Sequence, residues 1–97
     1  MSAFTYRAGK LHAESVALED IARRFGTPCF VYSRAALQGA LAQFQQACSR
    51  HGRADTLICY AVKANSNIAI LDLFARAGAG FDIVSGGELS QIGRAHV

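Results

Sequence analysis

Two spacings of apolar residues alternate along this chain, one typical of strands and one typical of helices. Three short runs are of strand length, at residues 29–32, 57–62 and 81–84, and they are apolar throughout except for Asp82. Three other segments carry apolar residues every three or four positions, at residues 18–25, 34–50 and 68–77. That spacing predicts amphipathic helices, and a further helix is expected to begin after residue 85. The sequence therefore predicts strands and helices in strict alternation.

The segment before this alternation and the ends of the helices carry local signals. Residues 4–14 predict two short extended pieces around Ala8-Gly9, a hairpin. A helix over 18–25 fits its acidic first turn and basic last turn, and Gly26 suits the left-handed position after it. Ser33 is expected to cap the second helix, and Ser66 or Asn67 the third. Glycines at 52 and 78 are expected to end these two helices.

The order of elements predicts an α/β fold. Strands that alternate with helices through short connections are parallel, with right-handed crossovers. The run over residues 57–62 is unbroken and not alternating, which is typical of a strand buried on both faces. The pattern alone does not distinguish an open doubly wound sheet from a (β/α)₈ barrel.

Composition argues against several classes of protein, among them membrane, secreted and nucleic-acid-binding proteins. The chain has 97 residues, 52% of them apolar, and a net charge of +3. This size permits one small domain, and no apolar run or leader-like start predicts a membrane span or a secretory signal, so we expect a cytoplasmic protein. The scattered cations predict no nucleic-acid surface. Three cysteines without a Cys-x-x-Cys pair predict no metal site or disulfide framework, and we expect three reduced, buried thiols, at residues 29, 48 and 59.

Candidate chemistry lies at the ends of the second and third predicted strands. Lys63 follows six apolar residues, so its amine is expected at the mouth of the sheet, where lost solvation favours the neutral form. Neutral amines form Schiff bases with aldehydes, pyridoxal phosphate included. A solvated lysine is the commoner outcome at such a position. Asp82 could form an ion pair with this lysine or orient a cofactor. Alternatively, it could be a buried carboxylate that only accepts hydrogen bonds from backbone N–H groups. Gly86-Gly87 fits a phosphate loop less well than an ordinary turn.

Three blocks in this order carry a resemblance that covers about residues 4–89. They read Gly-Thr-Pro-Cys-Phe-Val-Tyr-Ser at 26–33, Tyr-Ala-Val-Lys-Ala-Asn at 60–65, and Gly-Ala-Gly-Phe-Asp-Ile-Val-Ser-Gly-Gly-Glu-Leu at 78–89. The second block looks like the cofactor-lysine motif of the alanine-racemase-like, fold-type III pyridoxal-phosphate enzymes. Together the blocks closely resemble the diaminopimelate decarboxylase family within that group.

The resemblance implies a fold, a cofactor and a reaction. The fold is a pyridoxal-phosphate-binding (β/α)₈ barrel preceded by a segment of a β-domain, in a homodimer. Lys63 is expected to bind pyridoxal 5′-phosphate covalently, Asp82 to lie close to the cofactor, and Ala61 to leave room for its ring. The implied reaction converts meso-2,6-diaminopimelate to L-lysine and CO₂. The family's phosphate loop, substrate-carboxylate contacts and catalytic cysteine lie downstream, so Gly86-Gly87 is not that loop. The resemblance leaves the role of Glu88 open.

The resemblance also predicts how the chain is divided. We expect residues 1–16 to belong to the β-domain and residues 17–90 to begin the barrel with about three of its eight βα units. The resemblance stops near Ser90, and Ile-Gly-Arg-Ala-His-Val at 92–97 reads like a translated sequencing adapter. We therefore expect residues 91–97 to be a non-native tail, and the chain by itself to be an inactive fragment.

Three other functions stay open at this point. The first is a decarboxylase of another basic amino acid, namely ornithine, arginine or carboxynorspermidine. The second is a non-catalytic pyridoxal-phosphate-binding barrel, against which the segment at residues 4–14 argues because such proteins lack it. The third is a small α/β binding module without a cofactor.

Overall fold

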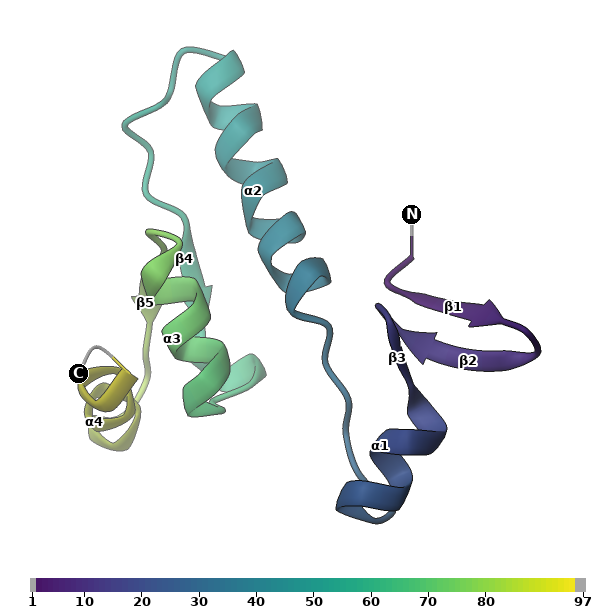
Figure 1. Ribbon diagram of the computed structural model, residues 1–97. Coiled ribbons are helices and arrows are strands. Elements are labelled where there is room, and N and C mark those ends of the chain that lie inside the picture. Colours follow the sequence, from purple (N-terminus) through teal and green to yellow (C-terminus); the bar gives the residue numbers. More distant parts are fainter. Residues whose placement is uncertain (1, 96–97) are drawn as a thin grey trace. The chain divides into compact units, whose positions relative to one another are not determined.

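Three short antiparallel strands begin the chain (Figure 1) in the computed structural model, which describes residues 2–95. They are β1 (Phe4–Arg7), β2 (Lys10–Ala13) and β3 (Val16–Ala17). The predicted hairpin is confirmed: Ala8 and Gly9 link β1 to β2 with φ values of 52° and 79°, as in the two-residue turns that suit a twisted hairpin. Strand β3 was not predicted, because two residues are too few to show an alternating pattern.

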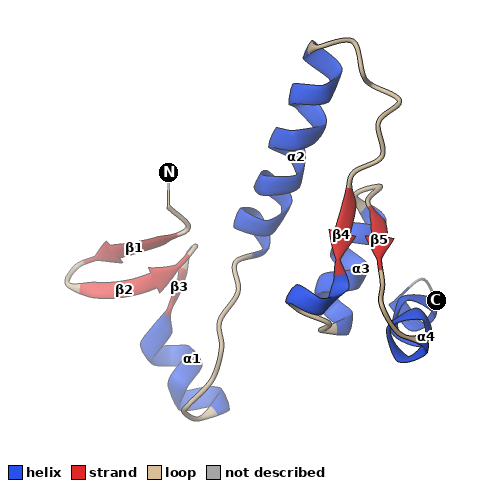
Figure 2. Ribbon diagram, turned by 180° about the vertical axis from the view of Figure 1, so that it is seen from behind, coloured by secondary structure: helices blue, strands red, loops and turns tan. Residues whose placement is uncertain are grey.

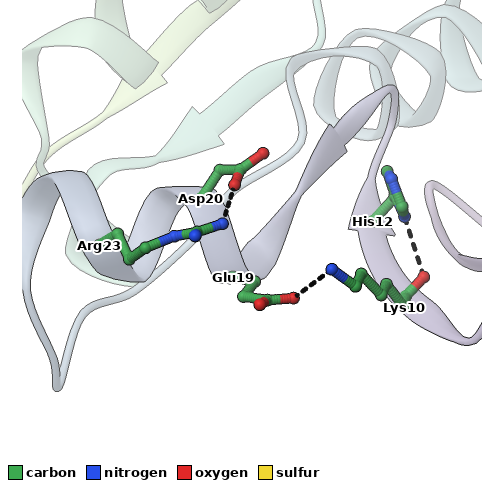
Figure 3. A network of polar contacts seen from close by, with 5 residues as sticks. All are labelled: Lys10, His12, Glu19, Asp20 and Arg23. Carbon is green, nitrogen blue, oxygen red and sulfur yellow. Dashed lines mark hydrogen bonds and ion pairs between the residues drawn. The ribbon is translucent and has the colours of Figure 1, made fainter.

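Helix α1 (Leu18–Phe25) confirms the first predicted helix, and Gly26 follows it with a φ of 81°. Figure 3 shows the polar contacts around it. The Lys10 amine lies 3.2 Å from a carboxylate oxygen of Glu19, and the guanidinium of Arg23 pairs with Asp20. All four side chains are more than half exposed, so these contacts add little to stability.

Helix α2 (Arg34–Arg50) begins at a cap that joins it to the turn between β2 and β3. The Ala36 N–H donates to Ser33 Oγ over 3.1 Å, which confirms Ser33 as the cap. Ser33 Oγ in turn donates to Glu14 Oε2 over 2.9 Å, and the Ala35 N–H donates to the same oxygen over 3.2 Å. These two hydrogen bonds, that from Ser33 first, lower the pKa of Glu14. We call Glu14, Ser33 and the first turn of α2 the Glu14 cap.

The strand predicted over residues 29–32 is wrong for the described residues. This segment is extended but pairs with no strand there, and Phe30 is 89% exposed. A strand forms only when a neighbouring segment hydrogen-bonds to it. The apolar run indicates that this segment is extended, but it does not show whether a partner strand is present.

A parallel pair of strands with helices after them makes up the second part of the chain. The elements are β4 (Cys59–Ala61), the 3₁₀ turn η1 (Val62–Ala64), α3 (Ile68–Arg76), β5 (Gly80–Asp82) and α4 (Gly86–Ala95). Cys59, Tyr60 and Ala61 lie opposite Gly80, Phe81 and Asp82. Figure 2 shows β4 and β5 side by side with α3 behind them. The predicted parallel α/β order is confirmed for this pair, and the (β/α)₈ barrel stays a prediction.

The apolar core of this part lies between the strand pair and its helices. Val62 and Leu71 are fully buried, and five half-buried apolar residues pack against them: Tyr60, Ile68, Phe81, Ile83 and Ile92. Helix α3 starts as predicted at Asn67, whose side chain accepts from the Ala69 N–H over 2.9 Å. It is followed by Gly78 at a φ of 89°.

Two expectations about burial are wrong. The strand expected over 57–62 spans only Cys59–Ala61, and Leu57 is 63% exposed, because β4 has one strand neighbour in the described residues and cannot be covered on both faces. The cysteines are free, but Cys29 and Cys59 are exposed and Cys48 is half-buried. Cys29 lies in the unpaired segment 29–32, and Cys59 begins β4, which has one strand neighbour among residues 2–95.

Helix α4 extends through residues 91–95 of the predicted tail, and Gln91 Nε2 donates to the Ser66 carbonyl over 3.3 Å. Met1, His96 and Val97 lie outside the described residues. The non-native origin of 91–97, the β-domain segment over 1–16 and the barrel start over 17–90 stay predictions. Within residues 2–95, none of the helices has the length and apolar character needed to cross a membrane.

Candidate active site at the carboxyl ends of β4 and β5

Lys63 lies in the turn that follows β4 directly. Its neighbour Val62 is fully buried and anchors η1 in the core, while the Lys63 side chain is exposed. The sequence predicted a desolvated amine at this place. The described residues do not provide that environment, because only two strands surround the amine there. The amine is therefore accessible to a ligand at this edge of the sheet.

Ala61 and Asp82 end the two strands and lie opposite each other. Their neighbours Tyr60 and Phe81 pack into the core, so alternation places Ala61 and Asp82 on the other face of the pair. Asp82 is exposed and the small Ala61 side chain is half-buried. The Asp82 carboxylate and the small Ala61 side chain therefore lie on one face, at the strand ends from which the Lys63 turn departs.

Ala61 was expected on the same side as Lys63 because the two residues are separated by one strand position. That argument requires the strand to continue through Lys63, but the backbone enters the 3₁₀ turn at Val62. The shared side of Ala61 and Lys63, like their roles at the cofactor, stays a prediction.

Hydrogen bonds close the turn that carries Lys63. The Asn65 N–H donates to the Val62 carbonyl over 3.1 Å, and the Tyr60 hydroxyl donates to the Asn65 carbonyl over 2.9 Å. The ring of Tyr60 lies 4.6 Å from that of Phe74, between ring centres. The sequence motif at residues 60–65 includes Tyr60 but did not reveal the role of its hydroxyl. Tyrosine in an otherwise apolar run was the available signal, since a buried hydroxyl needs a partner.

Glu88, whose role the sequence left open, belongs to the start of α4. The Glu88 N–H donates to Ser85 Oγ over 3.1 Å, and Glu88 Oε1 accepts from the Val84 N–H over 2.7 Å. This is close to a capping box, and the spacing Ser-x-x-Glu was its signal. A carboxylate already lies at this helix start, which supports the expectation that Gly86-Gly87 does not hold a phosphate.

An apolar hollow of about 200 Å³ lies beside β4. Its lining comes from the middle of α2, from β4 and from α3, and includes Phe44, Cys59 and Phe74. Ala61 lines this hollow but Lys63 and Asp82 do not, so the hollow adjoins the candidate site only at Ala61.

Residues 34–97 match the sequence profile of a family described as "Pyridoxal-dependent decarboxylase, pyridoxal binding domain". The chain belongs to the pyridoxal-dependent decarboxylase family. The matched part contains β4, β5 and the whole candidate site, and the cofactor that the family implies is pyridoxal phosphate.

Two relatives from the genus Pseudomonas carry the same name. The chain is 54% identical to diaminopimelate decarboxylase of Pseudomonas fluorescens and 51% identical to that of Pseudomonas aeruginosa, over 92 residues in each case. These matches cover 95% of this chain and 21% of each relative. A solved structure of diaminopimelate decarboxylase from M. jannaschii in complex with L-lysine superposes with a TM-score of 0.89 at 31% identity. It covers 100% of this chain, which in turn spans 24% of that structure.

The residues at the strand ends fit the aldehyde side of a decarboxylase cofactor. Lys63 supplies an exposed primary amine, the group that combines with an aldehyde. Asp82 supplies an exposed carboxylate at the end of the neighbouring strand, opposite the small side chain of Ala61.

Proposed function

We propose that this chain is the amino-terminal part of a diaminopimelate decarboxylase, which converts meso-2,6-diaminopimelate to L-lysine and CO₂ in the last step of lysine biosynthesis. The names of the relatives and the L-lysine bound to the M. jannaschii enzyme support this substrate. The proposal includes a homodimer and a cytoplasmic location for the full-length protein.

One observation carries the proposal: an accessible lysine on an anchored turn at the same sheet edge as an exposed aspartate. Lys63 would hold the cofactor through its amine, and the four-carbon stem allows that amine to approach and leave. Asp82 places a negative charge at this sheet edge, which favours a positively charged amine or cofactor there. Ala61 keeps the space beside Asp82 free.

Pyridoxal phosphate, when bound, accepts the electron pair that remains when a carboxylate leaves the substrate as CO₂. Within this chain, the buried Val62 and the closed turn hold the Lys63 backbone in place for that chemistry. The 97-residue chain spans about a fifth of its relatives, and we propose that it releases no CO₂ by itself.

The test uses the full-length protein that contains this chain. Release of CO₂ and formation of L-lysine from meso-diaminopimelate are measured for the unchanged protein, for Lys63→Ala and for Lys10→Ala, a control at another exposed lysine. We expect Lys63→Ala to lower kcat by about 10³-fold or more, as loss of a covalent catalytic group does. Lys10→Ala should keep full activity.

The same assay decides between the alternatives. Unchanged turnover in Lys63→Ala would overturn the role of Lys63. Turnover of ornithine, arginine or carboxynorspermidine in place of meso-diaminopimelate would replace the substrate, and cofactor binding without turnover of any of them would favour the non-catalytic protein.

A further inference from the structure

The Lys63 turn, residues Val62–Asn65, is tied at both ends. At its start Val62 is fully buried, and at its end the Asn65 carbonyl accepts the Tyr60 hydroxyl over 2.9 Å. The Asn65 side chain accepts from the Asn67 N–H over 3.0 Å, and Asn67 caps α3. The path of the chain from β4 to α3 is therefore fixed by local hydrogen bonds on both sides of Lys63.

Tyr60 holds the end of this turn from a rigid base. It lies in the middle of β4 opposite Phe81, and its ring packs against Phe74 and the core around Val62. The position of the hydroxyl is therefore set by the packing of its ring and by the strand pair. A hydrogen bond from a fixed donor restrains the Asn65 carbonyl, which belongs to the residue two positions after Lys63.

We propose that Tyr60 is a positioning residue for Lys63, an inference that rests on the proposed role of Lys63 in holding the cofactor. The Tyr60 hydroxyl keeps the Lys63 turn in the conformation from which the amine meets an aldehyde. Without it the turn keeps its anchor at Val62 and the hydrogen bond between Asn65 and Asn67, but loses the hydrogen bond from Tyr60 to the Asn65 carbonyl. The amine then spends less time in the productive orientation, so its capture of the cofactor slows.

Three substitutions separate this role from a contribution to packing alone. Tyr60→Phe removes the hydroxyl and keeps the ring that contacts Phe74. Phe74→Leu disturbs the same ring contact and keeps the hydroxyl. Tyr6→Phe removes a hydroxyl from a tyrosine that is 74% exposed, and serves as the control for that chemical change.

The measurement is the rate at which Lys63 captures pyridoxal phosphate in the cofactor-free, full-length protein. The amine nitrogen adds to the aldehyde carbon with loss of water, and borohydride then supplies a hydride that makes the bond permanent. Mass spectrometry of the Lys63 peptide counts the product over time, and urea unfolding of each variant is measured in parallel. No turnover of substrate enters this readout.

We expect Tyr60→Phe to slow capture about fivefold, the effect of one lost hydrogen bond. Phe74→Leu should lower the urea midpoint more than Tyr60→Phe does but leave the capture rate within about twofold of the unchanged protein, and Tyr6→Phe should change neither. Equal capture rates in Tyr60→Phe and the unchanged protein would overturn the inference. The inference would also be overturned if the variant with the lower urea midpoint, whether Tyr60→Phe or Phe74→Leu, were also the one that captures the cofactor more slowly.

The two proposals fail in different ways. If the unchanged protein captures the cofactor on a lysine other than Lys63, the proposed role of Lys63 is wrong and the inference falls with it. If Lys63 captures the cofactor and Tyr60→Phe captures it equally fast, only the inference about Tyr60 is wrong.

Discussion

Residues 2–39 and residues 40–95 belong to two units that keep their structure by different means. The first unit buries Ala13 and Ser33, while four of its aromatic side chains are more than half exposed: Tyr6, Phe25, Phe30 and Tyr32. The second buries six larger apolar side chains: Leu41, Val62, Ile70, Leu71, Leu73 and Phe74. Apolar burial is the main stabilising term in folding. The second unit, which carries the candidate site, therefore has a core, whereas the first depends on its strand ladder and the Glu14 cap.

The largest effect is expected where that core is deepest. Leu71→Ala should lower the free energy of unfolding by about 3–5 kcal/mol, because a fully buried leucine leaves a cavity. Leu89→Ala makes the same change at a leucine that is 60% exposed and should cost less than about 0.5 kcal/mol. Urea unfolding measures both. Similar losses in the two variants would show that burial does not distinguish these positions.

A smaller effect is expected at the closest approach between the paired strands. A Cβ added at Gly80 would lie 2.9 Å from Cys59 Sγ and 2.9 Å from Leu57 Cδ2, the ends of two exposed side chains that can move aside, so Gly80→Ala should cost at most about 1 kcal/mol. Gly39→Ala, at a helix position with no atom within 4 Å, should instead stabilise by about 0.5–1 kcal/mol. Opposite signs in urea unfolding are the expected result, and a gain at Gly80 would contradict it.

The first unit should respond to loss of a cap. Ser33→Ala removes the acceptor for the Ala36 N–H and the donor to Glu14, and should cost about 1 kcal/mol. Hydrogen exchange at the Ala36 amide should accelerate as well. Ser49→Ala near the other end of α2 is the matched control, and the same exchange rate in both variants would show that Ser33 does not stabilise the helix start.

Acid should weaken the same cap. The hydrogen bond from Ser33, and then that from Ala35, lowers the pKa of Glu14 below its usual value of 4.5. A carboxyl group with a lowered pKa in the folded state stabilises above pH 4.5, and this stabilisation is lost as the pH falls through the folded-state value. The urea midpoint of Glu14→Gln should therefore fall less than that of the unchanged protein when the pH is lowered from 6 to below 4.5. Parallel pH profiles of the two proteins would contradict this.

The smallest effect is expected at the surface ion pair between Lys10 and Glu19. Both side chains are more than half exposed, so Lys10→Met should change the free energy of unfolding by less than about 0.5 kcal/mol. Urea unfolding at low and high salt checks this. A loss as large as that in Ser33→Ala would show that charge pairing, and not capping, stabilises the first unit.

Local signals made much of the fold predictable. Helix α1, the Ser33 and Asn67 caps and the turn at Gly78 were all expected, because each depends on a few neighbouring residues. The strand over residues 29–32 was wrongly predicted, because pairing depends on a partner that the run itself does not encode. The exposed thiols at Cys29 and Cys59 follow from the same cause.

The candidate site was predictable only in part. The order of strands and helices alone predicts Lys63 and Asp82 at one edge of the sheet. The turn at Val62 was not expected, because an apolar residue serves equally as the last residue of a strand or as the buried anchor of a turn. The Tyr60 hydroxyl was missed because its acceptor is a backbone carbonyl, which no side-chain pattern reveals.

The parallel pair has a consequence for the behaviour of the chain in solution. Each of β4 and β5 has one strand neighbour among the described residues, so each has an outer edge on which backbone groups can accept another strand. Two large apolar side chains are exposed close to β4. Leu57, two residues before this strand, is 63% exposed, and Phe44, which lines the hollow beside β4, is 65% exposed. Open edges beside apolar surface are templates for strand addition between molecules. In isolation at high concentration, this polypeptide is therefore expected to self-associate through these edges, and a charged residue on the outer edge of β4 would be the direct way to keep it monomeric.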